Sequence, residues 1–244
     1  GLDETAVTAA RDRLEKLREL DKRREAVLAS LAERDLLTDA LRAALETAPT
    51  LAALEDLYLP YRPKRRTRAM IARERGLAPL ADWLLARAKD GQTSDPRVEA
   101  RKYAQADRGV ADAEAALAGA RDILAEMASE DAGTRAAMRE LFARRGTLSS
   151  SVVKGQAEAG AKYRDWFDFS EQVRAMPSHR LLAVLRGERE GALSVTIRPA
   201  EDEALGLLSR RWPQGRGAVA EQIGLALADG YKRLLAPSLE TDIR

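Results

Sequence analysis

The sequence predicts a mainly α-helical protein, a multi-helix scaffold with helix-turn-helix-like hairpins and at most a minor β-ribbon. Three observations support this fold class. Apolar residues recur at helical spacing in several long segments of the 244 residues. Gly, Pro, Ser, Thr and Asp stand where helices begin and end. Only 5% of residues are aromatic while 45% are hydrophobic, a balance that favours Ala- and Leu-rich amphipathic helices over aromatic strands.

One long amphipathic helix is predicted at the start of the chain, from Asp3 to about Arg34. Its apolar residues fall within an arc of roughly 140° at ~100° per residue. They are Leu14, Leu17, Leu20, Val27, Leu28 and Leu31. Two shorter helices are expected over residues 39–47 and 51–59, because Thr38 and Thr50 are suitable N-caps.

The next segment is defined by its Pro and Gly residues. Pro60 disfavours a helical residue before it, so the third helix should end there, and residues 61–66 should be extended. Two more helices are expected, from Thr67 to Arg75, stopped by Gly76, and from Pro79 to about Ala88.

A polar break over residues 90–95 is the expected internal boundary. It separates an N-terminal helical region with a basic segment (1–90) from a central helical region with the minor β-ribbon (91–244). Asp95 and Pro96 form an N-cap and first-turn pair. In the following long helix, Asp122 and Glu126 should point away from the apolar face. That face contains Val110, Ala113, Leu117, Ala120, Ile123, Leu124 and Met127.

Two β-favouring runs lie in the central region, over residues 147–153 and 192–197, and would pair as the minor ribbon. A helix capped by Ser178 is expected between them. Helices are also expected over residues 134–145 and 217–235, the latter broken at Pro237.

Composition argues against several kinds of site. The chain has no Cys, which excludes disulfides, thiolate zinc sites and Cys nucleophiles, and its single His179 argues against a histidine-built metal site. Phosphate-loop and nucleophile-elbow motifs are absent. We therefore expect no catalytic residue, metal or cofactor. Without a membrane-length apolar run or a signal-peptide pattern, a cytoplasmic protein is expected.

A basic segment is the strongest candidate site. The formal net charge is only +2, so affinity for nucleic acid must come from local clustering of cations. The run RPKRRTR follows two tyrosines and holds five cations suited to phosphates: Arg62, Lys64, Arg65, Arg66 and Arg68. In the alternative interpretation, the run is a solvated loop whose cations pair with Glu55, Asp56 and the acidic face of a neighbouring helix.

Three further features each have a structural alternative. The helices around Gly76 resemble a helix-turn-helix, although a plain structural hairpin is the better interpretation because Arg75 and Asp82 stand where apolar residues are wanted. Asp122 and Glu126 have a spacing compatible with a divalent cation, but an ion-paired surface explains them more simply. His179 lacks the partners that a catalytic base needs.

Three ordered segments resemble the Tex family of bacterial transcription accessory proteins. They are LEDLYLPYRPKRRTRAMIARERGLAPLADWL, ALAGARDILAE at 116–126 and PSHRLLAVLRGEREGALSV at 177–195. The resemblance covers nearly all of the chain and implies a helical platform containing a helix-turn-helix. It also implies a fragment that begins at Gly1 inside the family's N-terminal region and ends at Arg244, without the family's RNase H-like and C-terminal RNA-binding domains.

These observations together predict a non-enzymatic scaffold fragment of a transcription accessory protein. It is expected to bind RNA or DNA weakly and non-specifically through the five cations. The alternative is a helical protein-interaction platform that docks the missing domains or the transcription machinery without contacting nucleic acid directly. No membrane and no small-molecule cofactor is expected as a partner.

Overall fold

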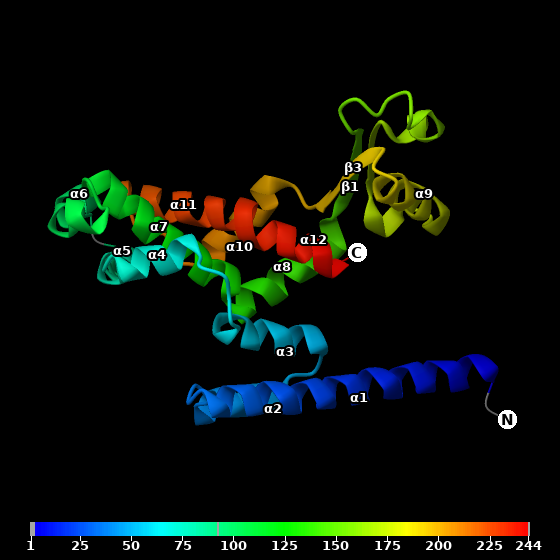
Figure 1. Cartoon of the computed structure of the whole chain (residues 1–244), viewed down its shortest axis with the longest axis horizontal. Coiled ribbons are helices and arrows are strands. Elements are labelled where there is room, and N and C mark those ends of the chain that lie inside the picture. Colours follow the sequence, from blue (N-terminus) through cyan, green and yellow to red (C-terminus); the bar gives the residue numbers. More distant parts are fainter. Residues whose placement is uncertain (1–2, 92, 244) are drawn as a thin grey trace. The chain divides into compact units, whose positions relative to one another are not determined.

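The computed structural model describes residues 3–91 and 93–243. Its elements are mostly helices with one small antiparallel sheet, which confirms the predicted fold class (Figure 1). The described residues form two compact units. Unit 1 extends to Arg65 and includes Glu130–Ala136, and unit 2 contains Arg66–Ser129 and the residues from Ala137 onward. The predicted division at residue 90 stays a prediction about domains. The predicted fragment ends, Gly1 and Arg244, lie outside the described residues, as does Gln92 in the predicted polar break.

Unit 1 is built from three helices whose positions follow the predicted caps. They are α1 (Glu4–Glu33), α2 (Asp39–Thr47) and α3 (Leu51–Tyr58). The Thr38 hydroxyl accepts the Leu41 N–H and the Thr50 hydroxyl accepts the Ala53 N–H, both at 3.2 Å. A 3₁₀ turn over Leu59–Tyr61 holds Pro60, so the extended stretch begins one residue later than predicted. The core contains Leu20, Val27, Leu31, Leu45, Ala48, Leu54 and Tyr58.

A buried ion pair fixes the late segment of unit 1 to α3. Arg135, near the start of α8 (Ala132–Arg145), donates from Nε to Oδ1 of Asp56 at 2.6 Å. The two residues are only 5% and 3% exposed. Because both charges are removed from water, substitution of either residue alone should strongly destabilise the unit.

Unit 2 has a helical core drawn from segments throughout its sequence. Its helices include α4 (Arg68–Glu74), α5 (Ala78–Asp90), α6 (Pro96–Ala100), α7 (Ala113–Glu130, of which Glu130 belongs to unit 1), α10 (Glu201–Arg211), α11 (Gly217–Gly230) and α12 (Ala236–Ile243). Short 3₁₀ helices lie at Arg101–Tyr103 and Ala106–Arg108. Large core side chains include Leu80, Leu84, Leu117, Met138, Phe142, Leu208 and Ile223.

The predicted helical position of Val110 is wrong. Val110 is buried, but it pairs with Gln105 in an isolated bridge ahead of α7. Gly109, at φ +73°, turns the chain there, and Asp112 then caps α7 by accepting the Ala115 N–H at 2.8 Å. The helix therefore begins at Ala113, and Val110 reaches the core from the preceding loop.

The sheet contains the two predicted strands and one more. Its order is β2-β1-β3 and both pairings are antiparallel, with Thr147 opposite Gln172 and Arg198. The strands are β1 (Thr147–Val152), β2 (Asp168–Gln172) and β3 (Leu193–Arg198), with 3₁₀ helices at Ala161–Trp166 and Val173–Ala175 around β2. A separate small core joins this sheet to α9 (Ser178–Arg189), beside the strands in Figure 1: Leu148, Tyr163, Val184, Leu193, Val195 and Ile197.

The predicted break at Pro237 is also wrong. Between α11 and α12 the chain makes a π turn, Tyr231–Leu235, and the helix continues without interruption. The Ala236 N–H donates to the Tyr231 carbonyl, five residues earlier. A proline removes one backbone donor and its ring needs space, and the wider turn just before Pro237 supplies that space.

None of the described helices is both long and apolar enough to cross a membrane.

Candidate nucleic-acid interface

The first half of the basic segment extends from the end of the 3₁₀ turn in unit 1. The Arg62 N–H donates to the Leu59 carbonyl, and the Arg34 guanidinium donates to the Tyr61 carbonyl at 2.8 Å. Lys64 is half-buried and pairs with Glu130. Arg62 and Arg65 therefore extend from a stretch of backbone that is held at two points. Arg34 binds the Tyr61 carbonyl, and Glu130 binds the Lys64 ammonium group.

The second half of the segment, in unit 2, leads into α4. Thr67 caps this helix by accepting the Met70 N–H at 3.0 Å, and its hydroxyl donates to Oε1 of Glu126 at 2.8 Å. Arg73 donates to the other oxygen of Glu126 at 2.5 Å. One carboxylate thus fixes both the start and the body of the helix that carries Arg68.

The predicted surface position of Glu126 is wrong. Only 7% of it is exposed, although it was expected to point away from the apolar face of α7. The predicted ion pairing is confirmed, but it is buried and serves to position α4. An acidic residue among apolar neighbours gives no sequence signal for a buried role, because the donors come from residues more than fifty positions away.

The five cations of the segment differ in their partners. Lys64 pairs with Glu130, and Arg66 pairs with Glu74 at 2.5 Å. Arg62, Arg65 and Arg68 are exposed and make no ion pair with any residue that the structure describes. Three cations within seven residues therefore remain open to an external anion. The seven residues of the segment span at most about 25 Å of extended chain.

The alternative partners expected for the segment are only partly used. Glu55 binds Arg23 and Asp56 binds Arg135. Glu130, at the end of the acidic stripe of α7, does pair with Lys64. The interpretation as a fully neutralised loop therefore describes only part of the segment.

Arg68 acts electrostatically on Asp122, an acidic residue of α7 in unit 2. Burial raises the pKa of Asp122, and the charges of Arg233 and then Arg68 oppose this rise. Arg233 contacts it directly at 3.1 Å and also binds Asp229. Within the described ranges, no group of three or more acidic or His side chains is placed to hold a metal ion. Asp122 is thus part of an ion-paired network.

The hairpin of α4 and α5 has the predicted helices. Gly76 makes the turn in the left-handed region at φ +82°, and Ala72 and Leu77 are buried on either side of it. Arg75 and Asp82 are exposed. Recognition of nucleic acid by this hairpin stays a prediction, since its buried face explains the two helices by packing alone.

The predicted capping role of Ser178 is wrong. Ser178 is the first residue of α9, and Pro177 occupies the N-cap position without a side-chain hydrogen bond. His179 is exposed beside it. The helix therefore begins without a hydroxyl cap.

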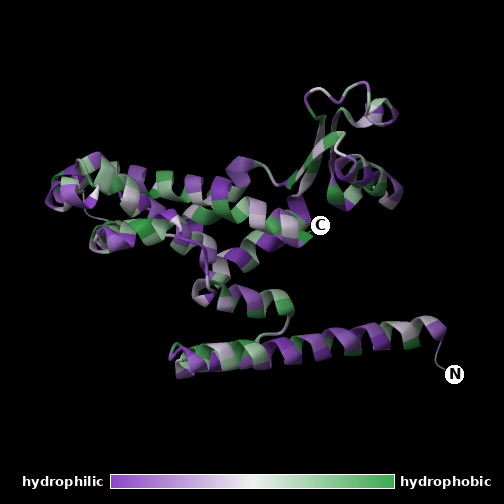
Figure 2. Cartoon of the chain, in the orientation of Figure 1, coloured by the Kyte–Doolittle hydropathy of each residue, from purple (hydrophilic) through white to green (hydrophobic). Residues whose placement is uncertain are grey.

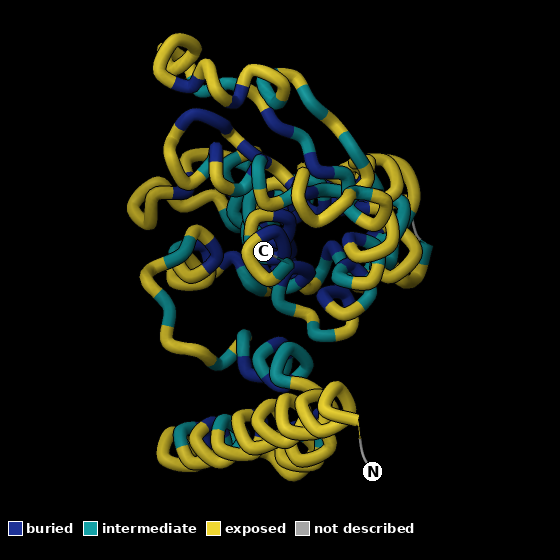
Figure 3. The backbone as a smooth tube through the Cα atoms, turned by 90° about the vertical axis from the view of Figure 1, so that its right-hand side faces the viewer, coloured by how far each residue is buried: buried dark blue, intermediate teal, exposed yellow. Residues whose placement is uncertain are grey.

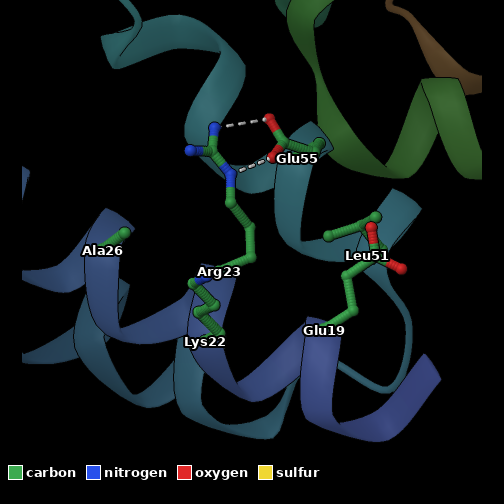
Figure 4. A pocket seen from close by; sticks show the side chains of 6 residues that line it. All are labelled: Glu19, Lys22, Arg23, Ala26, Leu51 and Glu55. Carbon is green, nitrogen blue, oxygen red and sulfur yellow. Dashed lines mark hydrogen bonds and ion pairs between the residues drawn. The ribbon is translucent and has the colours of Figure 1, made fainter. Parts of the chain in front are cut away.

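An open hollow of about 460 Å³ lies between α1 and α3 in unit 1 (Figure 4). Its lining residues are Glu19, Lys22, Arg23, Ala26, Leu51 and Glu55. Arg23 and Glu55 bind each other through two hydrogen bonds across it, and this pairing raises the pKa of Arg23. Two of the four charged residues that line the hollow therefore satisfy each other.

Comparison with known proteins gives a consistent result. A family model described as Tex central region-like matches residues 91–232. The transcriptional accessory protein Tex of Neisseria gonorrhoeae is 47% identical over 203 residues, which cover 83% of this chain and 26% of that protein. Protein tex of Bordetella pertussis is 48% identical over 197 residues, which cover 81% of this chain and 24% of that protein.

A eukaryotic relative is also similar along the whole chain. The human S1 RNA-binding domain-containing protein 1 is 27% identical over 258 residues, which cover 100% of this chain and 25% of that protein. The chain thus spans about a quarter of the length of these three relatives.

Proposed function

The chain belongs to the Tex central region-like family, and we propose that it is a non-enzymatic scaffold of a transcription accessory protein that binds RNA or DNA non-specifically. The contacts are made to phosphates by the basic segment. The names of the two bacterial relatives support a role in transcription, and the name of the human relative includes an S1 RNA-binding domain.

The observation that carries the proposal is the set of exposed cations Arg62, Arg65 and Arg68. They make no ion pair among the described residues, and the chain around them is anchored through Glu130 and Glu126. Phosphates attract clustered arginines without regard to base sequence. Lys64 and Arg66 contribute less to phosphate binding, because each must first break its ion pair with Glu130 or Glu74.

The test is a titration of fluorescent single-stranded and duplex oligonucleotides at several salt concentrations. The variant Arg62→Ala/Arg65→Ala/Arg68→Ala should lose most of the affinity. Its plot of log affinity against log salt should flatten by about 2 to 3 for three lost contacts, at ~0.7 to 0.9 each. A second variant adds Lys64→Ala and Arg66→Ala and should add little.

A matched control removes the same number of positive charges outside the basic segment, at three positions in unit 2. Arg164, Arg174 and Arg189 are exposed and make no ion pair among the described residues. Their triple alanine variant should bind nucleic acid like the parent. Equal losses in both variants would mean that only net charge matters. If the parent does not bind at low salt, the protein-interaction alternative takes the place of this proposal.

A further inference from the structure

The N-terminal half of α1 carries an apolar strip with no neighbour among the described residues of unit 1. Every residue from Asp3 to Glu19 is exposed, whereas the buried residues of the helix, Leu20, Val27 and Leu31, all lie in its second half. The exposed part of the helix is about 24 Å long at 1.5 Å per residue. In Figure 3 this stretch is drawn as exposed throughout.

The strip has the spacing of a helix-packing surface. We call Val7, Ala10, Leu14 and Leu17 the apolar strip, because their alternating spacings of three and four residues place them on one face. Val7, Leu14 and Leu17 are 52%, 47% and 41% exposed. Apolar residues appear among polar ones along this stretch in Figure 2. Helices in proteins gain most of their stability from packing such a face, which here has no described partner.

The charges beside the middle of the strip are positive, while Glu4, three residues before Val7, and Asp21, four residues after Leu17, lie at its two ends. Arg11 and Arg18 follow Val7 and Leu14 by four residues, and Arg13 lies between Ala10 and Leu17 on the other edge. Arg13 and Arg18 make no ion pair with a described residue, and Arg11 contacts only the adjacent Asp12, at 3.9 Å. The acidic residues Asp12, Glu15 and Glu19 lie on the opposite face of the helix.

We propose that the apolar strip docks an amphipathic helix of a partner protein whose apolar seam is flanked by Glu or Asp. The apolar residues provide burial, and the three arginines select the sign of the flanking charge. A second copy of this chain is disfavoured, because either orientation would place arginines against arginines. The apolar strip shares no residue with the basic segment, so this proposal does not depend on nucleic-acid binding.

The experiment uses the whole chain and two fluorescent synthetic helices with one leucine seam. One peptide has Glu at every flanking position and the other has Lys. Fluorescence anisotropy should detect binding of the Glu peptide only, with affinity that falls as salt rises. The variant Leu14→Ser/Leu17→Ser should weaken it about tenfold or more through lost burial, and circular dichroism should show an unchanged fold because both residues are exposed.

A charge reversal supplies the sharper test. The variant Arg11→Glu/Arg13→Glu/Arg18→Glu should bind the Lys peptide and reject the Glu peptide. The matched control reverses Arg164, Arg174 and Arg189 instead, which changes net charge equally and should leave the preference unchanged. Hydrogen exchange over residues 4–19 should slow when the Glu peptide binds.

Three results would overturn the proposal. They are failure to bind either peptide, equal binding of both, and a switch of preference in the control variant. Sedimentation that reveals a dimer abolished by Leu17→Ser would assign the strip to a second copy of the chain.

Discussion

The hydroxyl of Thr67 donates to the buried carboxylate of Glu126 at 2.8 Å while it accepts the N–H of Met70 at 3.0 Å. This one oxygen joins the cap of α4 to α7. The basic segment therefore enters unit 2 at a fixed point, and the position of Arg68 depends on a residue fifty-nine positions from the cap.

Removal of the Glu126 charge should destabilise the protein measurably. Glu126→Gln leaves Arg73 without its anion and exchanges an acceptor for a donor, so the free energy of unfolding should fall by about 1–3 kcal/mol. Urea denaturation measures this. Glu74→Gln is the control, because Glu74 and its partner Arg66 are both largely exposed and should cost less than about 1 kcal/mol. Equal effects of the two substitutions would contradict the buried role of Glu126.

The pair of Asp56 and Arg135 predicts a strong coupling within unit 1. Asp56→Ala removes the carboxylate that binds the buried Arg135 guanidinium and should lower the free energy of unfolding by about 3–5 kcal/mol. The double variant Asp56→Leu/Arg135→Met should recover much of this loss, because neither charge is then buried. A double-mutant cycle by chemical denaturation checks the coupling, and simple additivity would refute it.

Two glycines in helices predict opposite responses to alanine. A Cβ at Gly119 in α7 would overlap Leu77 Cδ1, whereas a Cβ at Gly224 in α11 meets nothing within 4 Å. Gly119→Ala should cost about 1–3 kcal/mol by overpacking. Gly224→Ala should add about 0.5–1 kcal/mol, because alanine has less conformational freedom to lose than glycine. Thermal denaturation of both variants distinguishes packing from helix propensity, which alone would stabilise both.

The carboxyl group of Glu190 should titrate at unusually low pH. Hydrogen bonds from Lys162, Tyr163 and Arg186 lower its pKa to about 2. Because the pKa of Glu190 is lower in the folded state, its ionised carboxylate contributes its full stabilisation when the pH is above the group's usual pKa of 4.5. This contribution is lost as pH falls from there toward 2.

Carbon NMR of the Glu190 side chain checks this shift. Lys162→Met/Arg186→Met should return the titration midpoint toward the usual value, while Arg189→Met should leave it low. A parent midpoint near 4.5 would show that these contacts are not maintained in solution.

The parts of the fold predicted correctly depend on local chemistry. Thr38 and Thr50 cap helices because a hydroxyl can reach an N–H two or three residues ahead whatever the rest of the chain does. Strand β2 has no comparable signal. Its residues, DFSEQ, include no β-branched side chain, and it forms by pairing with β1.

The candidate interface divides in the same way. The sequence alone placed five cations within seven residues, but it did not distinguish Lys64 and Arg66 from the other three. That distinction depends on Glu130 and Glu74, whose positions are set by tertiary packing and by α4. The break expected at Pro237 failed for a related reason, because the π turn before it is formed by a helix already packed in the core.

The late segment Glu130–Ala136 also determines when the first unit can finish folding during synthesis on the ribosome. The three N-terminal helices are synthesised first, but Asp56 meets Arg135 only after about seventy further residues have been added beyond Arg65. At 5–20 residues per second this interval lasts roughly 4–14 s. During that time the nascent first unit lacks Arg135 and the rest of its final segment, so its completion waits until residues 66–129 of the second unit have been translated.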